Sequence, residues 1–262
     1  MIKIFQYECR RLLWNKFFLG FLLVLLFYGW QVLNRVTILG VSHTAPFSSW
    51  SFGDYLSRML PLLWIGTLFF LTFFTSGKAR RVTILTDAAP MSRRRYALAR
   101  SAAALVGTGM VSLACLAEAA VFYVRYFGFV RLELLLPALV ILPPALVFAL
   151  GSGWLLGRYR GWMLYIWMLA PILCMFLPLP DCLGIWNGSF FHQYPLMLGT
   201  LDPAFSLPWS ILFVQGILLF LGIGLLLVCP QKLPFSTKTS PLYDTLSCGG
   251  GYDAKKDSSD RR

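Results

Sequence analysis

Long apolar segments are the feature of this sequence that most restricts its fold. Each of six such segments approaches or exceeds the roughly 20 residues that a helix needs to cross the hydrocarbon core of a bilayer. The runs are continuous rather than alternating, which favours helices over the strands of a membrane β-barrel. We therefore predict an all-α, polytopic membrane protein with six transmembrane helices, at residues 17–36, 59–76, 101–124, 133–157, 161–179 and 207–229.

The composition agrees with a membrane location, and the placement of the basic residues argues against nucleic-acid binding. Of the 262 residues, 58% are hydrophobic and 13% are charged, against about 45–50% and 25% in an ordinary soluble domain. The formal net charge of +12 is typical of some nucleic-acid-binding proteins. Here, however, most basic residues lie next to apolar segments, where membrane orientation and anionic headgroups account for them. We expect membrane lipid as a partner and no nucleic acid.

The distribution of basic residues between the apolar segments predicts the orientation. The N-terminus, the 77–100 segment, the 158–160 turn and the C-terminal tail together carry 19 of the 23 Lys and Arg residues. Basic segments next to spans stay on the cytoplasmic side. We therefore expect a multi-pass protein of the cell (plasma) membrane with both termini in the cytoplasm.

The segments outside the spans are short. Residues 1–16 place apolar side chains at helical spacing beside Lys and Arg, which predicts an interfacial amphipathic helix before the first span. A cleaved signal peptide is the rival interpretation, and the absence of an Ala-x-Ala site after the first apolar run argues against it. The six-helix transmembrane domain then covers 17–230, with an extracytoplasmic aromatic segment at 180–206. The polar, glycine-rich residues 231–262 predict a disordered cytoplasmic tail.

The third apolar segment carries two features that other segments lack. Ala103, Gly107, Cys115 and Ala119 form a stripe of small residues, which predicts close helix packing. Glu118 is an acid well inside the span, a costly position that marks a candidate functional site. It could line a substrate path or take part in a proton-linked step, or it could simply pair with a polar group on a neighbouring helix.

Motifs for catalysis or nucleotide binding do not appear in the sequence. Gly188-Ser189 and His192 fall outside any Gly-x-Ser-x-Gly context, so they favour an ordinary interfacial loop over a serine hydrolase. No Gly-x-x-x-x-Gly-Lys-Ser/Thr phosphate loop occurs, and the six cysteines are scattered. We expect no enzyme activity, cofactor or metal in this chain, and any ATP would have to be hydrolysed by another one.

The basic segment 77–100 carries the most specific pattern of the chain. Residues 76–81, Ser-Gly-Lys-Ala-Arg-Arg, leave the second apolar segment, and Pro90-Met91-Ser92-Arg93 leads into the third. Together with the layout of residues 1–230, this pattern resembles the membrane-spanning subunits of type-2 ATP-binding-cassette (ABC) transporters. The resemblance implies a cytoplasmic coupling helix that contacts the ATPase subunit, formed by Val82, Thr83, Ile84, Leu85, Thr86, Asp87, Ala88 and Ala89.

The same resemblance implies a complete transport assembly. The chain would be a permease subunit that forms a homodimer, or a heterodimer with a related permease, and binds two copies of an ABC ATPase subunit that holds ATP and Mg. Export of a lipid-like, peptide or drug-like substrate is the activity it implies. A secondary transporter or channel acting without an ATPase, with Glu118 as its ion site, is the alternative from the residues themselves; an intramembrane enzyme would need more polar residues at the depth of Glu118.

Overall fold

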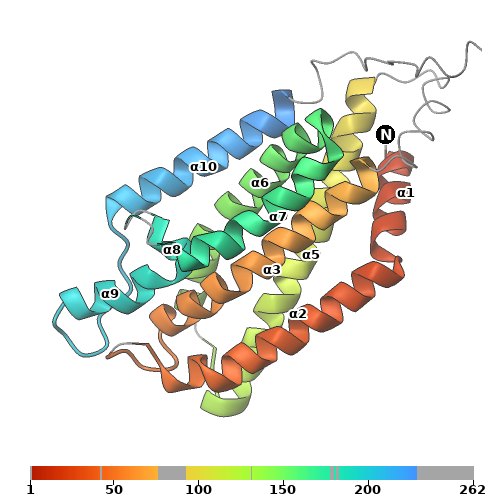
Figure 1. Ribbon diagram of the computed structural model, residues 1–262. Helices are drawn as coiled ribbons and strands as arrows, with labels where there is room; N and C mark the ends of the chain where they lie inside the picture. The colour runs from red at the N-terminus through yellow and green to blue at the C-terminus, as the bar shows by residue number, and fades with distance from the viewer. Residues whose placement is uncertain are drawn as a thin grey trace, which may run out of the picture. The chain divides into compact units, whose positions relative to one another are not determined.

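The computed structural model describes residues 2–41, 43–75, 93–130, 132–177, 180 and 183–228. All regular secondary structure within these residues is helical, as the sequence predicts. The long helices lie side by side as a bundle (Figure 1). The α-helices are α1 (Ile2–Leu13), α2 (Lys16–Arg35), α3 (Ser49–Thr75), α5 (Arg93–Phe127), α6 (Leu136–Tyr159), α7 (Gly161–Phe176), α8 (Gly184–Asn187), α9 (Ser189–Met197) and α10 (Trp209–Val228), with short 3-10 turns at Thr37–Leu39 and Leu132–Leu135.

Five helices of the described residues are long and apolar enough to cross a membrane. They correspond to Lys16–Leu39, Ser49–Phe74, Tyr96–Phe127, Glu133–Tyr159 and Trp209–Val228. The remaining apolar helix, α7, has 16 residues and is therefore about 24 Å long, short of a hydrocarbon core of about 30 Å. It ends at Phe176 because Leu177, with ψ 140°, precedes Pro178, and proline disfavours the helical conformation of the residue before it.

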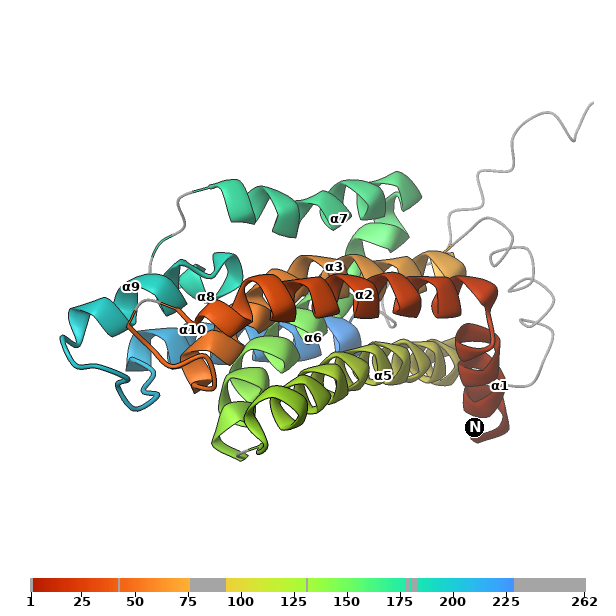
Figure 2. The ribbon, with the colours of Figure 1, turned by 90° about the horizontal axis from the view of Figure 1, so that it is seen from below.

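Helix α1 is separate from the first long helix and lies across one end of the bundle (Figure 2). Asn15 separates the two: its side chain accepts a hydrogen bond from the backbone N–H of Phe17 at 3.2 Å and caps α2. The buried residues of α1 are Glu8 and Leu12. The amphipathic pattern of residues 1–16 thus corresponds to a helix that packs on the bundle and also presents exposed residues such as Ile2 and Tyr7.

Helix α3 begins ten residues earlier than the predicted second span, at Ser49 rather than at residue 59. The backbone N–H of Phe52 bonds to the carbonyl of Ser48 at 3.2 Å, which starts the helix before its apolar part. The prediction was wrong about this boundary because Asp54 and Arg58 look like loop residues in a hydropathy pattern. In the structure they are one helical turn apart and pair with each other.

Small residues allow two close helix contacts. The stripe predicted on residues 101–124 is buried in α5, and a side chain on Gly107 would meet Leu12 of α1 at 2.6 Å. Helices α6 and α10 approach until a side chain on Gly222 would lie 2.7 Å from the backbone nitrogen of Phe148. At Gly222 the nearest atoms belong to the backbone of α6, so a larger residue would force α6 and α10 apart. At Gly107 the nearest atom is the end of the Leu12 side chain, which can shift.

Candidate functional site

The predicted coupling helix, residues 82–89, lies outside the described residues. What the structure describes at this point of the chain is the beginning of α5 and the helix that packs on it, α1. We call this the α1 end of the bundle, and we call the end at which α3 begins and α8 and α9 lie the α9 end (Figure 2). Each end holds one buried acid in a network of polar contacts.

At the α1 end, a buried ion pair joins α1 to α5. Arg100 Nε lies 3.5 Å from Glu8 Oε1, and the side chains are 8% and 2% exposed. The hydroxyl of Tyr96 donates to Glu8 Oε1 at 3.0 Å, and Arg100 Nη2 donates to that hydroxyl at 2.7 Å. On the outer side of α1, Arg11 lies 3.4 Å from Glu8 Oε2. The carboxylate thus has partners on both oxygens, which is what a buried charge requires.

Aromatic rings complete the surroundings of the Arg100 guanidinium. Its central carbon lies 4.3 Å from the centroid of the Tyr96 ring and 5.7 Å from that of Phe74 at the end of α3. Contacts of this kind stabilise a desolvated cation by about 1–2 kcal/mol. Three helices therefore meet at Arg100: α1 through Glu8, α3 through Phe74, and α5, which carries Arg100 itself. Helix α3 ends just before the segment 76–92, and α5 begins just after it.

Glu118 lies between the two ends of the bundle, on the face of α5 turned toward α2 and α3. Its Oε2 atom is buried and has no hydrogen-bond partner among the described residues. That atom occupies the space that a side chain would need at Gly29, close to the hydroxyl of Tyr55. Tyr55 itself donates to the backbone carbonyl of Cys115 at 3.3 Å. The pairing with a serine, threonine or basic side chain considered for Glu118 is not found within the described residues. The carboxyl group contacts the backbone of Trp30 on α2, and its Oε2 atom remains available to a proton or a ligand.

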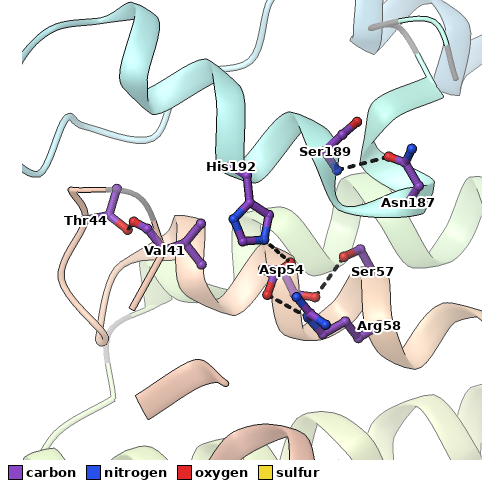
Figure 3. A network of polar contacts seen from close by, with 8 residues as sticks. All are labelled: Val41, Thr44, Asp54, Ser57, Arg58, Asn187, Ser189 and His192. Carbon is purple, nitrogen blue, oxygen red and sulfur yellow. Dashed lines mark hydrogen bonds and ion pairs between the residues drawn. The ribbon is translucent and has the colours of Figure 1, made fainter. Parts of the chain in front are cut away.

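At the α9 end, Asp54 of α3 connects two basic side chains from different helices (Figure 3). Its Oδ2 atom accepts from Arg58 Nε at 2.9 Å, and its Oδ1 atom accepts from His192 Nε2 of α9 at 3.2 Å. The carboxylate is 2% exposed, whereas Arg58 and His192 are 37% and 44% exposed. Since a carboxylate only accepts hydrogen bonds, the His192 proton at this contact is on Nε2.

The turn between α8 and α9 holds His192 against α3. Gly188 adopts φ +82°, a left-handed conformation that favours glycine. A Cβ at this position would lie 2.9 Å from Ser57 Oγ and 3.0 Å from Asp54 Oδ1. Asn187 closes an Asx turn just before α9, because its Oδ1 atom accepts from the backbone N–H of Ser189 at 3.0 Å.

Aromatic packing fixes the same region. Trp50, near the start of α3, is fully buried against Phe190, Phe191, Tyr194 and Phe205. Its indole N–H donates to the carbonyl of Pro203 at 2.8 Å. The aromatic residues between 180 and 206 therefore pack on α3 and position His192, a role that their composition alone did not indicate.

These contacts define what the polar groups can do. Ser57 donates to the Asp54 backbone carbonyl at 2.8 Å, and no contact between His192 and a serine hydroxyl is found in the described part of the chain. The contacts of Asp54 join α3 to α9 and leave the two basic side chains partly exposed to solvent. Over the same residues, no group of three His, Cys, Asp or Glu side chains could hold a metal ion. Asp54 was not among the predicted site residues, although its spacing of four residues from Arg58 is a recognisable signal of a helical ion pair.

The fold defines the class of this protein at a coarse level, as a helical protein whose described residues include five apolar helices of membrane-spanning length. Comparison of the chain with protein-family models, with curated proteins and with solved structures found no match. Arguments about function therefore rest on the residues and contacts described above.

Proposed function

We propose that this chain is the membrane-spanning permease subunit of an ATP-driven transporter of the type-2 ABC class. The chain would lie in the cell membrane with both termini in the cytoplasm, and α7 would act as a sixth, short membrane segment accommodated by local thinning of the bilayer. A dimer of permeases would bind two ATPase subunits, which hold ATP and Mg. A lipid-like, peptide or drug-like molecule would be exported.

The observation that carries this proposal is the link at the α1 end. Glu8, Tyr96 and Arg100 join α1 to the first turns of α5, and Phe74 at the end of α3 packs on the same guanidinium. A force applied to residues 77–92, which connect α3 to α5, would reach all three helices at once. An ATPase that pushes on this segment would thus move the bundle as a unit between states of different access.

The proposal is tested by isolating the full chain from its native membrane and asking whether an ABC ATPase comes with it. Leu85→Asp places a charge in the proposed coupling helix and should abolish the association. Leu201→Asp is the matched control, because Leu201 is exposed at the α9 end, and it should leave the association unchanged. Recovery of the chain without any ATPase, or equal recovery of the ATPase with Leu85→Asp, would contradict the proposal.

The orphaned oxygen of Glu118 favours a second candidate, a proton- or cation-coupled transporter or channel that works without an ATPase. An acid inside a span with one buried oxygen that lacks a partner is a candidate site for an ion or a proton. Ion-driven flux through vesicles that contain only the purified chain, abolished in Glu118→Gln, would support this candidate. Absence of flux from the chain alone would remove it.

A further inference from the structure

We infer that Arg58 and His192, held by Asp54 at the α9 end, form a binding site for the anionic oxygens of a phosphoryl group. The site is separate from the ATPase contact and goes beyond the proposed function. It does not depend on an ATPase, since all its residues are on α3 and α9. Figure 3 shows the two basic side chains reaching the same carboxylate from different helices.

The hydrogen-bond inventory of Arg58 is the first step. A guanidinium has five N–H donors, and the contact with Asp54 uses the one on Nε. Among the described residues, the two Nη atoms have no assigned partner, and the side chain is 37% exposed. The bond at Nε orients the planar group, so its remaining fork of donors is fixed before a ligand arrives. Such a fork matches phosphate oxygens in a bidentate geometry.

His192 adds a second group at the same carboxylate. Its Nε2 atom faces Asp54, and the other ring nitrogen points away from Asp54 and has no assigned partner within the described ranges. Protonation of that nitrogen turns it into a donor. The buried carboxylate of Asp54 contacts both basic side chains and so holds them close to one another.

The depth of the site indicates a ligand at the headgroup level. Asp54 is the sixth residue of α3, so it lies about 7.5 Å from the start of a helix of membrane-spanning length. Exposed apolar residues at the same end, including Met197, Leu198 and Leu201, can contact acyl chains. A phosphoryl group at this position could belong to a lipid headgroup or to free phosphate. The apolar surroundings favour the lipid.

The test measures thermal unfolding of the full chain in an uncharged detergent. Three additions are compared: short-chain phosphatidic acid, phosphatidylcholine with the same chains, and sodium phosphate. A ligand that binds the folded protein raises its Tm with concentration. We expect phosphatidic acid to raise the Tm more than phosphatidylcholine. Arg58→Gln should require about tenfold more phosphatidic acid for the same increase, the typical effect of losing a charge-assisted bidentate contact.

Arg125→Gln is the matched control, because Arg125 is an exposed arginine in the last turn of α5 and lies outside the contacts of Asp54 in the described residues. It should respond like the unmodified chain. If Arg58→Gln fails to fold, the double variant Asp54→Asn with Arg58→Gln removes the pair together and leaves no buried unpaired charge. Equal responses of the unmodified chain and the Arg58 variants would overturn the inference. An equal response to phosphatidylcholine that Arg58→Gln removes would still support the site, because that lipid also carries an anionic phosphoryl group.

The additions also distinguish the sources of the phosphoryl group. A Tm increase with sodium phosphate that Arg58→Gln removes would support the site and identify free phosphate as sufficient. An increase with phosphatidic acid alone would support the site and identify a lipid headgroup. Neither result depends on recovery of an ATPase, so failure of this site and failure of the proposed transporter would be recognised separately.

Discussion

The two ends of the bundle hold the same chemistry with different burial. At the α1 end, Glu8 and its partner Arg100 are both buried, and aromatic rings cover the guanidinium. At the α9 end, Asp54 is equally buried, yet Arg58 and His192 are each more than one-third exposed. The acid is inaccessible in both clusters. The difference lies in whether the bases keep donors that can reach a ligand.

This difference separates a structural joint from a binding site. Both charges of a buried ion pair lose their hydration and are held in a fixed geometry, so the pair keeps its two helices in register. Removing one partner is costly, because it leaves the other charge buried and unpaired. A half-exposed base keeps most of its hydration and contributes little to stability through its charge. The α1 end is therefore suited to transmit a displacement between helices, and the α9 end is suited to bind an anion.

The largest expected effect is at the α1 end. Arg100→Gln should lower the free energy of unfolding by about 3–5 kcal/mol, because it leaves Glu8 buried without its main partner. The measurement is thermal unfolding of the purified chain in uncharged detergent. The double variant Glu8→Gln with Arg100→Gln should recover part of the loss. A loss that the double variant does not reduce would mean that Arg100 stabilises the fold by packing and not by pairing.

The turn at Gly188 should give the next largest effect. Gly188→Ala should cost about 2 kcal/mol, because its left-handed φ and the nearby Ser57 and Asp54 both oppose a Cβ. Gly199→Ala is the control: its φ is +65° and no atom lies within 4 Å of the added Cβ. It should cost about 1 kcal/mol through backbone strain alone. Equal losses would show that α9 can move away from Asp54 freely.

The variant Arg58→Gln sharpens the comparison with Arg100→Gln, since it makes the same change at the other end. We expect a loss of about 1 kcal/mol in the free energy of unfolding, because the arginine is half-exposed and His192 still contacts Asp54. Thermal unfolding under the same conditions measures it. A loss as large as that of Arg100→Gln would show that the ion pair at the α9 end is as structural as the pair at the α1 end.

The smallest effect should come from salt. Raising the ionic strength from 0.1 to 1 M shortens the Debye length from about 10 to about 3 Å. The stability difference between the unmodified chain and Arg58→Gln should then shrink by a few tenths of a kcal/mol. The difference for Arg100→Gln should stay constant, because solvent ions do not reach a pair that is 8% and 2% exposed. Equal salt dependence of both differences would indicate that both pairs are open to solvent.

The placement of the polar residues was the weakest part of the sequence-based prediction. Hydropathy assigned Asp54 and Arg58 to a loop, whereas each neutralises the other within α3. Glu8 looked like one polar residue of an interfacial helix, and it is buried against α5. In both cases a basic partner offsets the free-energy cost of burying the acid. A hydropathy average over a window of sequence does not record which residues pair with each other. Glu118 was singled out because an acid within an apolar segment stands out in the sequence whether or not its partner is known; its role stays a prediction.

The sequence by itself determined that this chain is helical and apolar enough to enter a membrane, since long uncharged runs leave the backbone no other way to satisfy its hydrogen bonds. The predicted fifth span extended to residue 179, whereas α7 ends at Phe176, because Pro178 disfavours the helical conformation of the residue before it. Only the tertiary structure decided which charges are neutralised and which remain accessible. Glu8 meets Arg100 and Asp54 meets His192 across 92 and 138 positions of sequence, and only packing of the helices brings such residues together.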